Sequence, residues 1–185
     1  MKINITVFSF NGFQENTYIL SDESNNCVII DPGCYDRNEQ SEFVEYIQVN
    51  KLKPLALLST HAHIDHVLGN SFVLRTFDID YYLHKEDLTT LHSVANYAHV
   101  YGFQGYEPSP EPSHFLNHGD KLVFGEIELE VFFTPGHAPG HVVFYNAENK
   151  FVINGDVLFN GSFGRVDLPG GDIEILKKSI QHLVD

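Results

Sequence analysis

"PLALLSTHAHIDHVLGN", residues 54–70, runs from an apolar segment into a cluster of polar side chains. The apolar residues up to Leu58 are typical of a buried strand, and the segment after the cluster suits a helix. The loop between them holds four side chains that can each bind a metal: His61, His63, Asp65 and His66. The stretch therefore predicts a metal site in a strand-to-helix connection.

The spacing of these side chains supports that prediction. In an extended segment alternate residues point the same way, so His61 and His63 can converge on one ion. His66 comes three residues after His63, where a helix should begin, and returns to the same place from the other side. The segment can thus serve two neighbouring sites. Imidazole and carboxylate ligands suit zinc, with iron and manganese as alternatives.

Two later segments have the same character. "TPGHAPGHVVF", residues 134–144, places His137 and His141 in a turn rich in glycine and proline. "VINGDVLF", residues 152–159, ends an apolar strand at Asp156. A carboxylate at a strand end is well placed to bridge two cations. We therefore expect these segments to meet the first one.

The remaining chain reads as two runs of strands with helices between and after them. Alternating or β-branched segments predict strands, and apolar residues at helical spacing predict helices. Strands are expected within 3–10, 16–20, 27–31, 54–60, 79–83, 117–133, 141–146 and 150–156, and helices within 40–51, 70–77, 85–98 and 172–185. Residues 101–120 are expected to form a long loop. This order predicts two sheets packed face to face with helices outside.

Length and composition predict one compact domain over residues 1–185, because 43% of the residues are hydrophobic and can build a substantial core. The two cysteines, Cys27 and Cys34, are expected to be reduced thiols, with no role assigned. No apolar run approaches the roughly eighteen residues of a membrane span, and the first residues do not resemble a secretory signal. We therefore expect a cytoplasmic protein with no membrane partner.

The formal net charge of −14 argues against a nucleic-acid partner. Neutralising a phosphate backbone requires clustered lysine and arginine side chains. Bound metal cations would offset part of the negative charge. A small molecule is the expected partner.

Together, these motifs resemble the metallo-β-lactamase superfamily. His61-x-His63-x-Asp65-His66, "GHAPGH" (136–141), "GD" (155–156) and "GSFGRVDLPGGD" (161–172) are similar to its glyoxalase II-like members, the hydroxyacylglutathione hydrolases. The similarity extends from "ENTYIL" (15–20) and "DPG" (31–33) to the last helix. It implies an α+β fold, an αββα sandwich of two mainly antiparallel sheets with the metals at one edge.

The resemblance also implies roles for individual residues. The first metal would be held by His61, His63 and His137, the second by Asp65 and His66, and Asp156 would bridge both. Asp65 would also orient the attacking hydroxide. Three further residues are expected around the site: His141 as a support, and Arg165 and Asp167 at the rim. The residues alone equally allow a surface ion pair between Arg165 and Asp167.

The sequence departs from the family in one respect that bears on the second metal. Members normally supply a final histidine from a segment resembling "GHG" after the last helix, and the two-domain enzymes add a helical glutathione-binding domain; neither occurs here. His182, beside polar Lys178 and Gln181, is not expected to substitute. The chain is therefore expected to be either truncated after its last helix or incomplete at the second site.

The expected activity is metal-dependent hydrolysis of a thioester such as an S-acyl glutathione. A metal lowers the pKa of bound water from about 15.7 to near 7, which supplies hydroxide for attack on a carbonyl. Zinc is expected, with up to two ions. Alternatives with the same fold are a mononuclear-iron persulfide dioxygenase, a lactonase and a β-lactamase. An alternative of another class is a metal-binding domain that is inactive because its second site lacks a ligand.

Aromatic residues in and before the long loop could line an acyl pocket or could pack in the core: Tyr97, Tyr101, Phe103 and Tyr106. The sequence leaves these two possibilities open, together with the true substrate and the oligomeric state.

Overall fold

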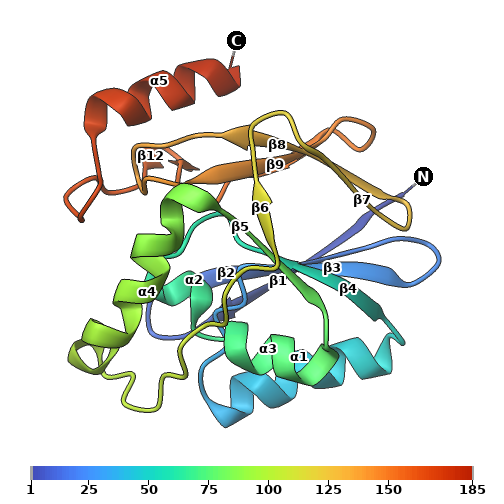
Figure 1. The fold of residues 1–185 in the computed structure, drawn as a ribbon. Helices are drawn as coiled ribbons and strands as arrows, with labels where there is room; N and C mark the ends of the chain where they lie inside the picture. The colour runs from blue at the N-terminus through green and yellow to red at the C-terminus, as the bar shows by residue number, and fades with distance from the viewer. Residues whose placement is uncertain (1, 185) are drawn as a thin grey trace.

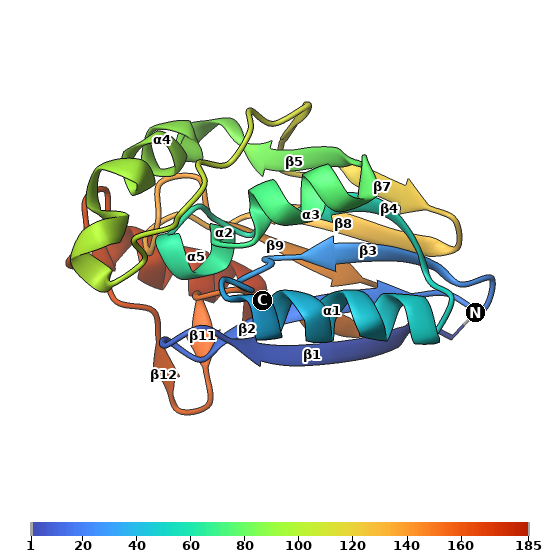
Figure 2. The same cartoon turned by 90° about the horizontal axis from the view of Figure 1, so that it is seen from below.

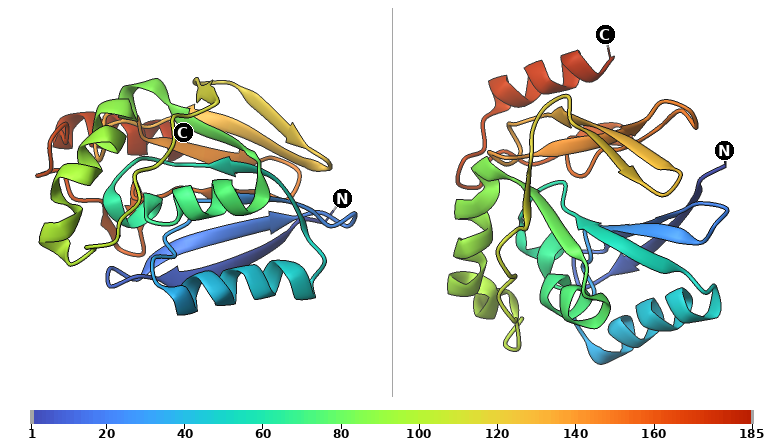
Figure 3. Two further views of the ribbon diagram at one scale, coloured as in Figure 1. Left: turned by 60° about the horizontal axis from the view of Figure 1, so that its bottom comes forward. Right: turned by 45° about the vertical axis from the view of Figure 1, so that its right-hand side comes forward.

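The computed structural model describes residues 2–184 as two β-sheets packed face to face with helices on both outer faces (Figure 1). Figure 3 shows the layers from two further directions. This is the αββα sandwich expected from the sequence. The predicted end of the last helix at Asp185 lies outside the described residues.

The first sheet has six strands in the order β1-β2-β3-β4-β5-β6. Their bounds are β1 (Asn4–Phe10), β2 (Glu15–Ser21), β3 (Asn26–Ile30), β4 (Lys53–Leu58), β5 (Asp80–His84) and β6 (His114–Leu116). The first three strands pair antiparallel through hairpins, whereas β3 to β6 pair parallel. Parallel neighbours need long crossovers, and helical segments supply them here. Most strand pairs in the molecule are antiparallel, as predicted, but the part of the first sheet from β3 to β6 is parallel.

The second sheet is antiparallel throughout, in the order β10-β9-β8-β7. Its strands are β7 (Lys121–Phe124), β8 (Ile127–Phe133), β9 (Val142–Asn146) and β10 (Phe151–Ile153). A small hairpin of β11 (Leu158–Phe159) and β12 (Ser162–Phe163) follows, and Figure 2 shows it projecting from the body of the protein. This hairpin was not predicted from the sequence.

Helices cover the outer faces of the sandwich. α1 (Arg37–Val49) and α3 (Asn70–Phe77) lie under the first sheet, and α5 (Ile173–Val184) lies over the second (Figure 1). The short α2 (Ile64–Val67) and the longer α4 (Leu88–Tyr97) stand near one end, and α4 is flanked by the 3-10 turns η1 (Lys85–Asp87) and η2 (Ala98–Tyr101). A capping box of Asp36 and Glu39 starts α1 at Arg37, three residues before the predicted Gln40.

The central strands are apolar on both faces, which explains their nearly continuous hydrophobic sequences. Ile30 and Leu58 face the second sheet, where they pack with Val131 and Phe144. Their neighbours in sequence point the opposite way, toward the helices under the first sheet, since side chains alternate along a strand. Two hydrophobic layers therefore hold the ends of β3 and β4 in fixed positions.

Residues 101–120 are not the uninterrupted loop expected from the sequence. His114–Leu116 forms β6, which pairs with β5 through Tyr82 and His84. Three residues between proline-rich and polar segments are too few to show a β period.

None of the helices in the described part of the chain is long and apolar enough to span a bilayer.

Both cysteines are free and fully buried in the structure. Burial raises the pKa of Cys27 to about 12 and raises that of Cys34 as well. Because the thiolate is the reactive form, we expect neither thiol of the native protein to react with an aromatic disulfide reagent at pH 8. Two thiols per chain should react once the protein is unfolded in guanidinium. Stoichiometric labelling of the native protein at the rate of a free thiol would contradict this burial.

Candidate metal centre

The predicted site residues lie on loops and on the short α2, which meet at one end of the sandwich. Parallel pairing of Ile30 with Leu58 sets the ends of β3 and β4 side by side. The backbone N–H of Thr60, just beyond β4, donates to Asp31, just beyond β3, at 2.7 Å. The Thr60 carbonyl accepts from Val142 at the start of β9, at 2.8 Å. These bonds join the loops of both sheets into one frame.

The first group of candidate ligands is His61, His63 and His137. Their ligand atoms lie within 4.8 Å of one another, and all three residues are buried. His137 Nε2 is 2.8 Å from His63 Nδ1 and 3.2 Å from His61 Nε2. The structure therefore brings together the three histidines that the sequence assigned to the first metal.

The hydrogen bonds around these rings set which nitrogens carry protons. The Thr60 hydroxyl donates its single proton to Asp31, so it can only accept from His61 Nδ1, at 3.0 Å. His137 Nδ1 lies 2.7 Å from the carbonyl of Arg165, to which it must donate. Neutral His61 and His137 therefore turn unprotonated Nε2 atoms toward each other. Converging lone pairs of this kind fit a metal cation.

The second group surrounds His66. Its Nε2 lies 3.6 Å from Asp65 Oδ2 and 3.4 Å from Asp156 Oδ1. The other oxygen of Asp156 is 3.5 Å from His137 Nε2. Asp156 thus lies between the two groups, where a bridging ligand would have to be.

The pKa shifts differ between the two groups of candidate ligands. Burial dominates in the first group, whereas the attraction between opposite charges dominates in the second. Desolvation lowers the pKa of His61 and lowers that of His63 to about 3, so both rings are neutral as ligands must be. Burial also opposes charge on His66, but Asp65, Asp156 and Asp31 raise its pKa well above the ordinary value. Burial likewise opposes charge on Asp156, yet the bond to His66 lowers its pKa to about 2. The second group therefore favours a positive charge among its carboxylates.

Two buried carboxylates behind His66 were not identified from the sequence. Asp31 Oδ2 is 3.1 Å from His66 Nδ1, and Glu15 Oε1 is 3.8 Å from the same atom. Glu15 Oε1 has no hydrogen-bond partner among the described residues. With Nδ1 directed at Asp31, the Nε2 atom of His66 is left to face Asp65 and Asp156. Asp31 can also be grouped with His61 and His66 as a metal site, but its bonds to Thr60 favour a supporting role.

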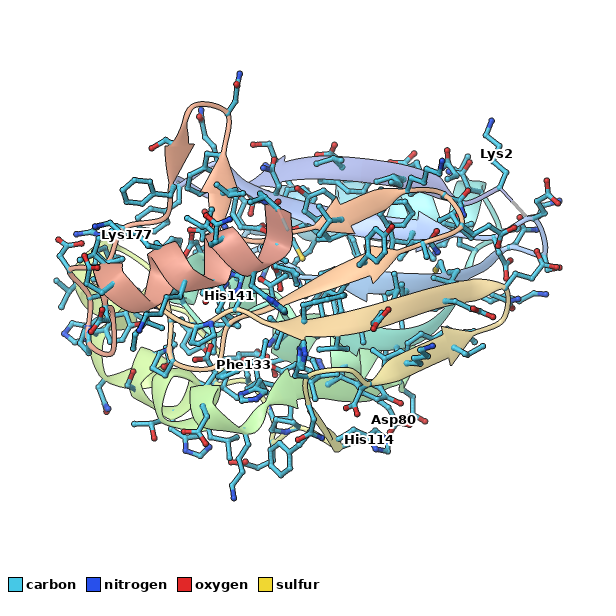
Figure 4. All side chains as sticks on the ribbon, turned by 90° about the horizontal axis from the view of Figure 1, so that it is seen from above. Lys2, Asp80, His114, Phe133, His141 and Lys177 are labelled. Atoms are coloured by element: carbon cyan, nitrogen blue, oxygen red, sulfur yellow. The ribbon has the colours of Figure 1, made fainter. Side chains whose placement is uncertain are left out.

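His141 has both ring nitrogens engaged. Its Nε2 accepts from the backbone N–H of Asp156 at 3.2 Å, so Nδ1 carries the proton and faces the Thr134 hydroxyl at 3.1 Å. Gly155, at φ +47°, leaves room for this contact, because a Cβ there would lie 2.7 Å from His141 Nε2. Figure 4 labels His141 beneath α5. His141 therefore holds Asp156 in place and has no nitrogen free for a metal.

Arg165 and Asp167 form an exposed, two-pronged ion pair at 2.7 and 2.8 Å. This is the surface pair that the residues alone allowed, and its exposure makes it a minor contributor to stability. Arg165 also lines the pocket beside the site, and its carbonyl holds His137. The ring of His182 packs near those of His118 and Phe132 on the outside of the second sheet.

Asp87 joins the two histidine loops and was also missed in the sequence. Its two carboxylate oxygens accept from the backbone N–H groups of Ala62, at 2.6 Å, and Gly140, at 2.7 Å. Ala62 lies between two candidate ligands, and Gly140 precedes His141. Burial raises the pKa of Asp87 to about 6, although both hydrogen bonds oppose the shift. A single buried carboxylate thus fixes the spacing of loops that share the first group of ligands.

Replacing Asp87 by asparagine (Asp87→Asn) is expected to weaken metal binding about 10- to 100-fold, the usual effect of losing a group that orients ligands. The amide would turn an N–H₂ group toward one of the two N–H donors. Competition with a chromophoric chelator measures the affinity.

Asp22→Asn is the matched control for this change. Asp22 is also buried and accepts backbone N–H bonds from Asn26 and Glu126, but it follows β2 at the end opposite Glu15. The Asp22→Asn substitution should lower the melting temperature without changing the affinity for metal. Equal affinity losses in both variants would show that Asp87 acts only through general stability.

A pocket of about 730 Å³ opens beside the candidate ligands. Four of them form one end of it: His63, Asp65, His137 and Asp156. α4 and η2 supply one wall, and residues 168–170 supply another. Of the aromatic residues considered in the sequence, Tyr97 and Tyr101 line this pocket, whereas Phe103 and Tyr106 pack with the core around α1 and α3.

The sequence model of the metallo-beta-lactamase superfamily matches residues 10–184. The chain belongs to this superfamily. A Bacillus subtilis relative, described as the probable metallo-hydrolase YqgX, is 40% identical over 168 residues, 90% of this chain and 77% of that protein. The Haemophilus influenzae hydroxyacylglutathione hydrolase GloC is 32% identical over 180 residues, 97% of this chain and 83% of that protein.

A solved structure shares this fold closely. TTHA1623, crystallised in a di-iron-bound form, is 37% identical and superposes with a TM-score of 0.85, covering 97% of this chain and 85% of that one. The superfamily membership and the clustered ligands together identify a metal-dependent hydrolase of the metallo-β-lactamase fold.

Proposed function

We propose that the protein hydrolyses thioesters with two divalent metal ions, in the manner of the hydroxyacylglutathione hydrolases. The observation that carries the proposal is the pair of ligand groups joined through Asp156. The sequence similarity of this chain to the hydroxyacylglutathione hydrolase GloC supports a thioester as the substrate. The pocket next to the ligands has room for the substrate.

The ligand set follows from the contacts described above. One ion would be held by His61, His63 and His137, the other by Asp65 and His66, and Asp156 would contact both. We propose zinc, because imidazole and carboxylate ligands suit it, and treat iron as the alternative because the related TTHA1623 binds it. When bound, such ions acidify water and polarise a carbonyl.

The protein residues then have separable tasks in the reaction. Water adds to the thioester carbonyl carbon, and the carbon–sulfur bond breaks to give a carboxylic acid and a thiol. Asp65, which is partly exposed and lines the pocket, would take a proton from the attacking water through its carboxylate and return it to the departing sulfur. Asp156, whose pKa is about 2, stays ionised and is poorly suited to this transfer. Asn11 donates to the Asp65 carbonyl at 3.0 Å and so fixes the backbone of the proposed base.

A substrate panel tests the proposal. Full-length protein loaded with zinc, or separately with iron, is assayed with S-lactoylglutathione, an aliphatic lactone, a β-lactam and glutathione persulfide. Thioester turnover that a chelator abolishes and added metal restores is expected. Oxygen consumption with the persulfide, or turnover of only the lactone or β-lactam, would replace thioester hydrolysis with one of the alternative activities. Absence of turnover with every substrate would favour a binding domain.

A further inference from the structure

The side chains that line the pocket beside the candidate ligands indicate which kind of substrate the pocket can hold. We infer that it binds an uncharged, mostly apolar substituent of the substrate, so that thioesters with a medium-length alkyl chain are hydrolysed better than those with small groups. This inference rests on the proposed thioesterase function. The volume of about 730 Å³ lies in the range of roughly 300–1,000 Å³ that holds drug-sized ligands.

One wall comes from the α4–η2 segment. Thr89, Ser93 and Tyr97 follow one another on α4 at intervals of four residues, which places them along one side of that helix, and Tyr101, the last residue of η2, also lines the pocket. Each presents carbon atoms and a neutral hydroxyl. Burial raises the pKa of Tyr97 to about 12, so its phenol remains uncharged at neutral pH. This wall can contact an alkyl chain and donate to a carbonyl, but it brings no charge.

Other parts of the pocket lining are apolar. Pro139, Leu168 and Pro169 line the pocket from the loops that follow β8 and the β11–β12 hairpin. Phe13, from the β1–β2 turn, stands at the rim with its ring 5.8 Å from that of Tyr101. A flexible apolar chain could therefore be covered on several sides.

Charge is confined to particular parts of the described lining. Asp65 and Asp156 stand at the metal end. The guanidinium of Arg165 is bound by Asp167 through two hydrogen bonds. The neutral walls between them disfavour ionised substituents, because burying a charge without a partner is costly. Each methylene buried there should instead raise binding by up to about fourfold.

Two substrate series locate the apolar group. One varies the acyl chain from acetyl to butyryl, hexanoyl and octanoyl on N-acetylcysteamine, and the other keeps acetyl and lengthens the alkyl chain of the thiol. The inference predicts that kcat/KM rises with chain length in at least one series, by up to about fourfold per methylene. The rising series identifies whether the acyl or the thiol side occupies the pocket. Flat or falling values in both series would overturn the inference.

Pocket variants connect this preference to α4. Ser93→Trp fills the pocket, and Thr89→Asp brings a charge to an exposed position that should tolerate it. Each is expected to reduce the octanoyl-to-acetyl ratio of kcat/KM at least tenfold. Ser41→Trp, at an exposed position on α1, is the matched control and should keep the wild-type ratio. Melting temperature and metal content show that each variant is folded. Unchanged ratios in both folded pocket variants would contradict the assignment.

Binding without turnover separates the inference from the proposed function. S-alkyl thioethers of N-acetylcysteamine cannot be hydrolysed, and calorimetry gives their affinities for the metal-loaded protein. If affinity rises with alkyl length while no thioester is hydrolysed, the thioesterase proposal fails and the pocket assignment stands. If thioesters are hydrolysed but neither kcat/KM nor thioether affinity depends on length, the pocket assignment fails alone.

Discussion

The His137→Ala variant is expected to lose the metal of the first site and to lower thioester kcat/KM by about 1,000-fold or more. His137 Nε2 is the atom common to the close contacts with His61 and His63, and it also neighbours Asp156. Removing it breaks the three-histidine group. Lewis-acid stabilisation is worth several kcal/mol, and about 4 kcal/mol corresponds to a thousandfold. Elemental analysis of the purified variant gives the metal content, and steady-state kinetics give the rate.

His114→Ala is the control for this substitution. Its imidazole is exposed at the edge of the first sheet, 3.4 Å from Asp80. Figure 4 labels these two side chains next to each other. The His114→Ala variant should retain the metal content and the thioester kcat/KM of the wild type. Full metal stoichiometry in the His137→Ala variant would contradict the ligand assignment.

The second large effect is expected for Asp65→Asn, which keeps the shape of the side chain but cannot accept a proton. General-base catalysis contributes about 10²–10⁴-fold, and kcat should fall by that amount with a smaller change in KM. Because Asp65 is also a proposed ligand, metal content is measured in parallel, and kinetics are recorded with excess zinc. A variant that binds both ions yet remains slow would separate proton transfer from metal binding.

Asp78→Asn provides the comparison for Asp65→Asn. Asp78 ends α3 in the left-handed conformation at φ 51°, which asparagine adopts equally well. The activity of the Asp78→Asn variant should match that of the wild type. Wild-type kcat in the Asp65→Asn variant would remove Asp65 from the mechanism.

The ligand motifs could be read from the sequence because their chemistry is local. His61, His63 and His66 follow one apolar strand, so their convergence depends only on strand alternation and a helix start. The sandwich was predictable for the same reason, since each strand and helix has its own apolar period. The parallel pairing of β3 to β6 was not, because pairing direction depends on contacts between segments far apart in the chain.

The supporting carboxylates could not be identified for a related reason. Asp87 begins contacting Ala62 and Gly140 only when loops 25 and 53 residues away are brought beside it. In the sequence it resembles any acidic residue in the first turn of a helix. Asp31 gave a weak signal, a carboxylate directly after a buried strand, but the following Pro32 and Gly33 indicated a turn. Glu15 gave none, because its burial is created by tertiary packing.

Anomalous scattering from crystals of the full chain, measured on both sides of the zinc and iron absorption edges, would locate bound metal ions directly. We expect one metal peak enclosed by His61, His63 and His137, and a second peak beside His66 with Asp156 between the two. Crystals grown with excess zinc or iron that show no peak among these side chains would contradict this ligand assignment.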